Sequence, residues 1–220
     1  MHKNFITLGL LIIGLSSCQE ITTDSSVHVH LDGRSKPKVL VLDIIDHSQS
    51  SLPWDLSLEL SEKIKDNLKN FGTIYLKDSL ALHENVDSHE LAKQIQKKPS
   101  FDSHIVFDCE FIVAIEVIEH VLTPIPEKKN PSHPQAQSQS FSCKTRVKVF
   151  DVRHETAQLI LSEIVSHEGF VPWQLSTINY KKTHYLTKQY KITPIGLGHK
   201  TLSQTIAKKI EDYVLLAKSR

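Results

Sequence analysis

The chain of 220 residues has little of what sequence-readable active sites are made from. It contains only three cysteines and seven glycines. A Gly-x-Ser-x-Gly elbow, a His-Glu-x-x-His motif and a Cys-x-x-Cys pair are missing from it, which excludes the commonest hydrolase and metal signatures. An excess of one charge is missing too, because 26 Lys and Arg balance 25 Asp and Glu to a formal net charge of +1. No global basic field exists to attract nucleic acid, so a nucleic-acid partner is not expected.

What is present is the composition of a folded domain. Hydrophobic residues make up 40% of the chain and charged residues 23%. This is enough apolar material for one sizeable core, and it fits neither a disordered chain nor a multi-span membrane protein. Chains usually divide into domains only beyond about 250 residues, so we expect a single domain.

The first residues have the layout of a secretory signal peptide. A short cationic head, Met1 to Asn4, precedes the uncharged apolar run from Phe5 to Leu15, and the small residues Ser16 and Ser17 follow. A stable transmembrane helix needs about 20 apolar residues, so this run is too short to be one. Residues 1–17 are therefore predicted to be a cleaved leader.

The junction Leu15-Ser16-Ser17-Cys18 resembles the bacterial lipoprotein box. The resemblance implies that Cys18 is acylated and becomes the mature N-terminus, with two or three acyl chains giving stable membrane attachment. An ordinary signal peptide with a coincidental Cys18, or a buried N-terminal strand, is the alternative. In such lipoproteins an aspartate after the cysteine favours the inner membrane. Here Gln19 stands in that place, which favours the outer membrane with the protein facing the periplasm.

Residues 18–37 are polar and small and are closed by Pro37, which predicts a flexible lipidated tether. Within it, His28 and His30 would share one face of a strand, but no third ligand stands at a standard spacing. We therefore expect no metal site there. The folded domain is predicted to span residues 38–220.

The first half of that domain reads as a β-α-β unit followed by a helix. Residues 38–45 form an aliphatic run typical of a strand buried on both faces. Apolar residues at helical spacing predict a helix over 56–71 that ends at Gly72. A short strand at 73–76 follows, and Asp87 begins a capping box that opens a helix reaching about Lys97.

The centre of the chain predicts a long hairpin. Alternation over 103–120 indicates a strand with Phe111 on its buried face and His120 on its wetter face, and 141–152 indicates a second strand. Residues 122–139 form a proline-rich loop between them. A hairpin closed near residue 130 places Glu116 opposite Lys144, so we interpret the basic residues of the second strand as cross-strand charge partners rather than a nucleic-acid or phospholipid patch.

The same register separates the two cysteines of the domain. Cys109 would lie opposite residue 151 and Cys143 opposite residue 117, roughly 25 Å apart at ~3.3 Å per residue. A disulfide needs Cα atoms within about 7 Å, so free thiols are expected unless the sheet has another topology.

The last third predicts a strand over 158–167, an irregular aromatic segment over 169–197 and a C-terminal helix over 201–218. Residues 196–201 open that helix, and we expect them to act in capping and loop geometry rather than in phosphate binding. The fold class is therefore α/β (α+β), a mixed sheet of about five strands flanked by two to three helices. Trp173 and Tyr180 in the aromatic segment are the predicted partner-binding residues.

No catalytic residue and no cofactor is predicted. Most of the thirteen histidines fall in expected loops or at the ends of elements, and none within the domain has ligand spacing of i, i+4. Those assigned to loops or ends are His47, His83, His89, His133, His154, His167 and His184.

The order of these elements resembles the envelope lipoproteins related to LpoB, to the curli secretion lipoprotein CsgG and to the N-terminal domain of TolB. The resemblance rests on the lipoprotein box, the aliphatic strand at 38–45 and the strand Thr145 to Val152, and it covers roughly residues 38–217. It implies a non-enzymatic, membrane-tethered interaction or assembly factor that binds an envelope protein. A CsgG-like subunit of an outer-membrane secretion assembly, whose 103–152 hairpin extends toward a membrane, is the alternative, and a periplasmic enzyme is a third.

Overall fold

The computed structural model describes residues 28–30, 32–78, 82, 86–98, 100–105, 108–126 and 137–220. The predicted signal peptide, the lipidation site Cys18 and the proline-rich centre of the 122–139 loop lie outside these residues. No helix in the described part of the chain is both long and apolar enough to cross a bilayer.

A mixed sheet and three helices make up the described fold, as the fold class predicted. The strands are β1 (Lys38–Val41), β2 (Ile45–Asp46), β3 (Tyr75–Lys77), β4 (Phe111–Pro124), β5 (Gln139–Asp151) and β6 (Gln158–Val171), and the helices are α1 (Leu56–Phe71), α2 (Ser88–Lys97) and α3 (Pro194–Lys218). The strand order is β3-β1-β4-β5-β6, with β2 also paired to β4. The pairs β1–β3, β1–β4 and β2–β4 are parallel, whereas β4, β5 and β6 are antiparallel.

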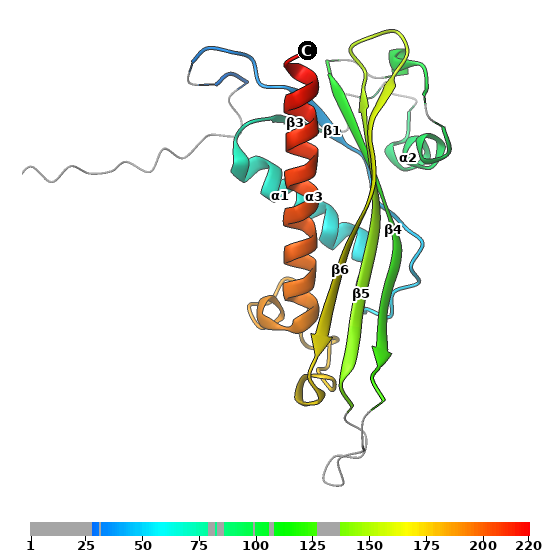
Figure 1. Ribbon diagram of the computed structural model, residues 1–220, viewed down its shortest axis with the longest axis vertical. Helices are drawn as coiled ribbons and strands as arrows, with labels where there is room; N and C mark the ends of the chain where they lie inside the picture. Colours follow the sequence, from blue (N-terminus) through cyan, green and yellow to red (C-terminus); the bar gives the residue numbers. More distant parts are fainter. Residues whose placement is uncertain are drawn as a thin grey trace, which may run out of the picture.

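Helices cover the sheet unequally (Figure 1). α1 and α3 lie on one face, and their apolar stripes pack on Phe111, Val113 and Val147. α2 covers the other face only at one end, where Leu91 and Ile95 join a second, smaller core. The sheet is therefore buried on both faces near α2 and on one face beyond it.

Local signals set the ends of α1 and α2 where the sequence predicts them. The Asp55 carboxylate accepts a hydrogen bond from the Ser57 amide at 2.8 Å, and Gly72 adopts the left-handed φ of 68° that closes α1. At α2, the Asp87 carboxylate accepts from the Glu90 amide at 2.9 Å. The predicted caps, Gly72 of α1 and Asp87 of α2, are confirmed.

The long strand predicted over 103–120 is wrong at its start, because β4 begins at Phe111. Residues 103–105 form a 3₁₀ turn, and Asp108 has a φ of 52°, outside the extended region. The Asp108 carboxylate bonds the ammonium groups of Lys38 and Lys77. These ion pairs hold Asp108 where the alternating side chains had predicted a continuous strand.

The hairpin register differs from the prediction by two residues. Glu116 faces Arg146, not Lys144, and the two side chains form an ion pair. A shift of two residues keeps every side chain on its face, so the prediction of acidic and basic partners is confirmed. Lys144 pairs instead with Glu119, at 3.0 Å between Nζ and Oε2.

A β-bulge between Val117 and Glu119 adds a residue to β4 and reverses the faces beyond it. His120 therefore points into the core, opposite Cys143, and its predicted place on the wetter face is wrong. Cys109 lies before β4, and both Cys109 and Cys143 are free, as expected.

The C-terminal elements are longer than the sequence indicates. β6 runs to Val171, and α3 begins at Pro194, so the irregular segment spans only residues 172–193. The Thr193 hydroxyl caps α3 by accepting from the Gly196 amide at 3.0 Å. Gly196 and Gly198, which disfavour a helix by propensity, lie in its first turns because no side chain fits there.

Part of the predicted tether is also folded. Val29 and Ser35 pair as an antiparallel bridge, with Gly33 at a φ of 82° in the turn between them. The His28 ring lies 3.9 Å from the Tyr75 ring of β3. We call residues 28–30 and 32–36 the N-terminal hairpin. It rests on the β3 edge of the sheet.

We expect Gly196→Ala to destabilise the fold more than Gly169→Ala. A Cβ at position 196 would lie 2.0 Å from the carbonyl oxygen of Tyr190, and backbone must move to admit it. At position 169 the nearest atom is a His167 ring nitrogen at 3.4 Å. Thermal unfolding followed by circular dichroism should show a loss of about 1–3 kcal/mol for the first variant. Equal midpoints for the two variants would contradict this packing.

Candidate functional site

Three ionisable side chains meet between the helices and the sheet. Glu59 of α1 and His199 of α3 are completely buried, and His120 of β4 is nearly so. Burying such groups is costly unless they are hydrogen-bonded to one another. Their contacts therefore determine how the three elements pack.

The contacts form a continuous chain. His199 Nδ1 lies 3.0 Å from Glu59 Oε1, and His199 Nε2 lies 3.0 Å from His120 Nε2. His120 Nδ1 lies 3.1 Å from the hydroxyl of Ser50, in the loop before α1. We call Ser50, His120, His199 and Glu59 the buried relay.

Further groups satisfy the Glu59 carboxylate. The Trp54 indole donates to Oε2 at 2.9 Å, and the Lys63 ammonium lies 3.8 Å from Oε1. The Tyr190 hydroxyl lies 2.8 Å from His199 Nδ1, beside the same carboxylate. Burial opposes ionisation of Glu59, but hydrogen bonds from His199, Trp54 and Tyr190 outweigh it and lower the pKa of the carboxyl. Burial raises the pKa of Tyr190, which stays protonated.

Each member of the buried relay comes from a local feature of its element. Glu59 lies in the first turn of α1, where a helix favours a negative charge. The β-bulge turns His120 inward. His199 follows Gly198, whose missing Cβ would lie 2.6 Å from Phe141 Cε1, so the glycine allows α3 to approach the sheet closely.

Two arrangements of protons satisfy all of these contacts. In both, His199 Nδ1–H donates to ionised Glu59 and His120 carries one proton. If His199 is neutral, His120 Nε2 donates to it and His120 Nδ1 accepts from Ser50. If His199 is charged, His199 Nε2 donates to His120, and His120 Nδ1 donates to Ser50. The two arrangements differ by one proton on His199, by which nitrogen of His120 carries its proton, and by the direction of the hydrogen bond to Ser50.

The order of hydroxyl, imidazole and carboxylate is the order that hydrolases use to activate a nucleophile. Burial, followed by the charge of His199, lowers the pKa of His120 to about 4. A base with so low a pKa is weak near neutral pH. The buried relay is therefore better suited to holding α1, α3 and β4 together than to activating Ser50.

Four aromatic rings cover the Glu59 end of the buried relay. We call them the aromatic roof: Trp54, Tyr180, Tyr185 and Tyr190. The Trp54 ring lies 5.3 Å from Tyr190, 5.8 Å from Tyr185 and 6.3 Å from Tyr180, measured between ring centroids. Three of these rings come from the irregular segment 172–193. Tyr180, which the sequence predicts as a partner-binding residue, is thus half-buried in internal packing.

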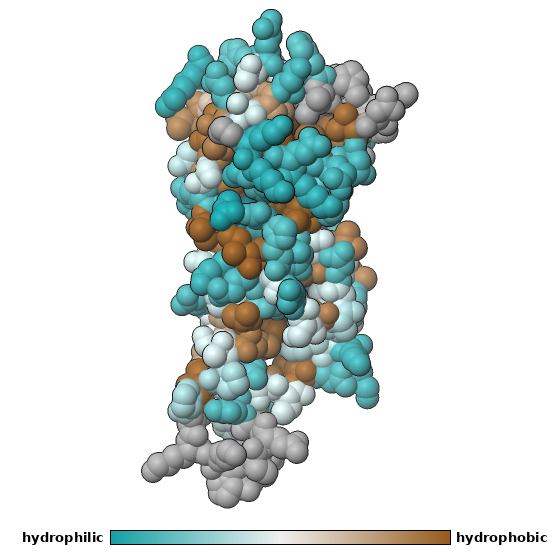
Figure 2. Space-filling model, turned by 90° about the vertical axis from the view of Figure 1, so that its right-hand side faces the viewer, coloured by the Kyte–Doolittle hydropathy of each residue, from teal (hydrophilic) through white to brown (hydrophobic). Residues whose placement is uncertain are grey.

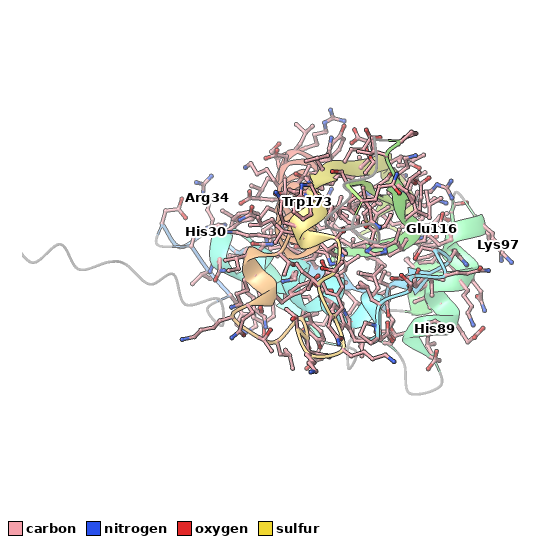
Figure 3. The ribbon with its side chains drawn as sticks, turned by 90° about the horizontal axis from the view of Figure 1, so that it is seen from below. His30, Arg34, His89, Lys97, Glu116 and Trp173 are labelled. Carbon is pink, nitrogen blue, oxygen red and sulfur yellow. The ribbon has the colours of Figure 1, made fainter. Side chains whose placement is uncertain are left out.

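Trp173, the other predicted partner-binding residue, lies in a short 3₁₀ turn, Trp173–Leu175, and is also half-buried. In the view from below in Figure 3 it lies near the middle, with His30 and Arg34 on one side and Lys97 of α2 on the other. The structure does not test whether Trp173 or Tyr180 contacts a partner, so this stays a prediction.

Large apolar side chains are exposed around this end of the molecule. Five of them lie within residues 170–197, and Leu186 and Ile192 are 70% and 77% exposed. We call the five residues the distal apolar surface: Phe170, Leu175, Leu186, Ile192 and Leu197. Exposed apolar side chains of this kind are candidates for contact with a partner.

Sequence reasoning missed His120 and His199. They are 79 positions apart, and the bulge hides the inward direction of His120. One signal was present, since the glycines at 196 and 198 leave space on α3 beside His199. Among the described residues, no group of three or more His, Cys, Asp or Glu side chains is arranged to hold a metal ion.

We expect His120 to make stability depend on pH. Its pKa is about 4 in the folded chain and 6.5 ordinarily, so between these values the unfolded chain binds a proton that the folded chain does not. This contribution is fully present above pH 6.5 and is lost as the pH falls to 4, on the order of 3 kcal/mol. Urea unfolding of His120→Gln should show a flatter decline across this range than the wild type.

His154→Gln is the matched control, because His154 is exposed. It should keep the wild-type slope. An unchanged slope in His120→Gln would contradict the buried, neutral state of His120.

The comparisons with known proteins bear on the fold and the family. The model of the "Family of unknown function (DUF7499)" matches residues 25–218. No curated protein matches the chain. Among solved structures, the hypothetical protein CT253 from Chlamydia trachomatis is 26% identical with a TM-score of 0.66, over 82% of this chain and 98% of that chain.

Two more distant structures are bacterial lipoproteins. Lipoprotein GNA1162 from Neisseria meningitidis is 12% identical with a TM-score of 0.40, over 80% of this chain and 99% of that chain. The minor lipoprotein from Acinetobacter baumannii is 11% identical with a TM-score of 0.38, over 80% and 90%. Likenesses this low carry no argument about function, and the resemblance to LpoB, CsgG and TolB stays a prediction.

Proposed function

We propose that this chain, which belongs to the DUF7499 family of unknown function, is a lipid-anchored envelope protein that acts as a non-enzymatic interaction or assembly factor. The observation that carries the proposal is the uncharged run from Phe5 to Leu15, which ends at the lipoprotein box and Cys18. The acyl chains on Cys18 hold the protein at the bacterial outer membrane, facing the periplasm. Its partner is another protein of the envelope.

The arrangement of the domain supports this role. The N-terminal hairpin lies toward the upper end in Figure 1, and the segment 172–193 lies at the lower end. Residues 18–27 reach at most about 35 Å when fully extended. A protein held by this tether presents the distal apolar surface on the side away from its attachment.

The chemistry of the buried relay also favours binding over catalysis. His120 is too weak a base near neutral pH to activate Ser50, as its pKa indicates. The relay and the aromatic roof instead support the segment 172–193 from beneath. A rigid support lowers the entropy lost when a partner binds the surface above it.

Cys18→Ala should abolish lipidation and membrane attachment, because the thiol is the acylation site. Expressed in a Gram-negative host, the wild type should incorporate radiolabelled palmitate and show globomycin-sensitive processing. The variant should do neither and should leave the membrane fraction. The buried Cys143 offers a control, since Cys143→Ala should keep both properties. Unchanged fractionation of Cys18→Ala would contradict the anchor.

The distal apolar surface should carry the partner contact. Pull-down of the full anchored chain from detergent-solubilised envelope should recover a stoichiometric partner. The double variant Leu186→Asp, Ile192→Asp should reduce its recovery at least tenfold, because both side chains are exposed and neither belongs to the core. Leu216→Asp is the matched control, since Leu216 is 52% exposed near the end of α3. Equal recovery with all three proteins would exclude this surface.

A further inference from the structure

β6 is the last strand of the sheet that the described residues form. It forms a ladder with β5 on one side only. Within the described residues, no other segment makes a backbone hydrogen bond to positions 158–171. An exposed edge of this kind is a template for pairing with another strand.

Proteins usually protect such edges with charge, proline, bulges or short strands, and β6 has little of this protection. Its pairing with β5 is irregular only at its start, between Val149 and Phe150 of β5, and is regular from Leu161 to Val171. That stretch contains no lysine, arginine or proline, and its charged side chains are Glu163 and Glu168. Ile164 is exposed on it. The side chain of Ile164 faces the α2 side of the sheet, the side on which Figure 2 shows hydrophobic patches below the hydrophilic cover of α2.

The other open edges of the sheet are protected. β3 is three residues long, and the N-terminal hairpin rests against it through His28 and Tyr75. Beyond β2, the free edge of β4 is broken by the bulge after Val117 and ends in Pro124. These edges are poor templates for strand pairing. A head-to-tail contact, in which β6 of one copy pairs with β3 or β4 of another, is therefore disfavoured. A symmetric contact of β6 with itself needs only the one edge.

We propose that β6 pairs antiparallel with β6 of a second copy of this chain, so that the two sheets become continuous across a two-fold axis. This inference does not depend on the lipid anchor or on the distal apolar surface.

Pairing of each glutamate with a hydrogen-bond donor, an imidazole or a hydroxyl, favours one register. When the axis passes through Val165, Glu163 of each copy faces His167 of the other, and Ser162 faces Glu168. Glu163 and His167 both lie on the α3 face, where Glu163 pairs with Lys209 at 2.5 Å. Registers that place Glu163 or Glu168 opposite its own copy bring like charges together, which is destabilising.

In the same register Ile164 faces Ser166 of the other copy. Directly opposed residues of an antiparallel pair have Cα atoms about 4.5–5.5 Å apart, within disulfide range. Two copies of Ile164 are diagonal neighbours about 7–8 Å apart, at the limit of that range. A cysteine at each position therefore reports the register.

The experiment mixes full-length Ile164→Cys and Ser166→Cys, carrying tags of different mass, and oxidises them mildly in detergent. We expect the mixed disulfide to exceed the disulfide of either variant alone several-fold on a non-reducing gel. Light scattering should give the mass of two chains for the wild type. The wild type also measures background from the native cysteines, of which Cys109 and Cys143 are poor nucleophiles because burial raises their thiol pKa to about 11 and about 12.

Ser140→Cys is the matched control, because Ser140 is exposed on the same face but belongs to the interior strand β5. It should not cross-link above background. A single-chain mass, cross-linking of Ser140→Cys as strong as that of the mixture, or a predominant disulfide of Ile164→Cys with itself would overturn the proposal.

Discussion

The hydrogen bond between Glu59 and His199 is the interaction on which the rest of the structure depends. Both side chains are completely buried, and removing one partner of a buried pair typically costs about 3–5 kcal/mol. A domain has only about 5–15 kcal/mol of net stability. The surrounding elements therefore have to keep this pair intact, and several irregular features of the fold serve that end.

Three of these features work together. The β-bulge in β4 brings His120 to His199, the glycines of α3 let the helix approach the sheet, and Trp54 closes the carboxylate side. Each one supplies a hydrogen bond to the buried relay or makes room for one of its side chains. The packing of α1, α3 and β4 is therefore linked to the buried relay.

The parts of the fold that follow from local rules could be predicted from the sequence. α1 and α2 appear where apolar spacing and the predicted caps Gly72 and Asp87 place them. The acidic and basic faces of the hairpin were also predictable, because a register error of two residues preserves side-chain direction. His120 and His199 were not predictable in this way. A bulge reverses the first, and the glycines beside the second resemble a loop unless their close contacts are known.

The segment that carries most of the distal apolar surface is held in place by the residues packed beneath it. The segment 172–193 has only two short 3₁₀ turns as regular structure, and by itself would lose much entropy on binding a partner. Tyr190, one of its residues, is completely buried and reaches His199, while Tyr180 and Tyr185 pack on Trp54. The buried relay thus holds the inner side of the segment, and the apolar side chains on the outer side of the segment stay exposed to solvent. The lowered pKa of His120 keeps this support uncharged at that ring near neutral pH.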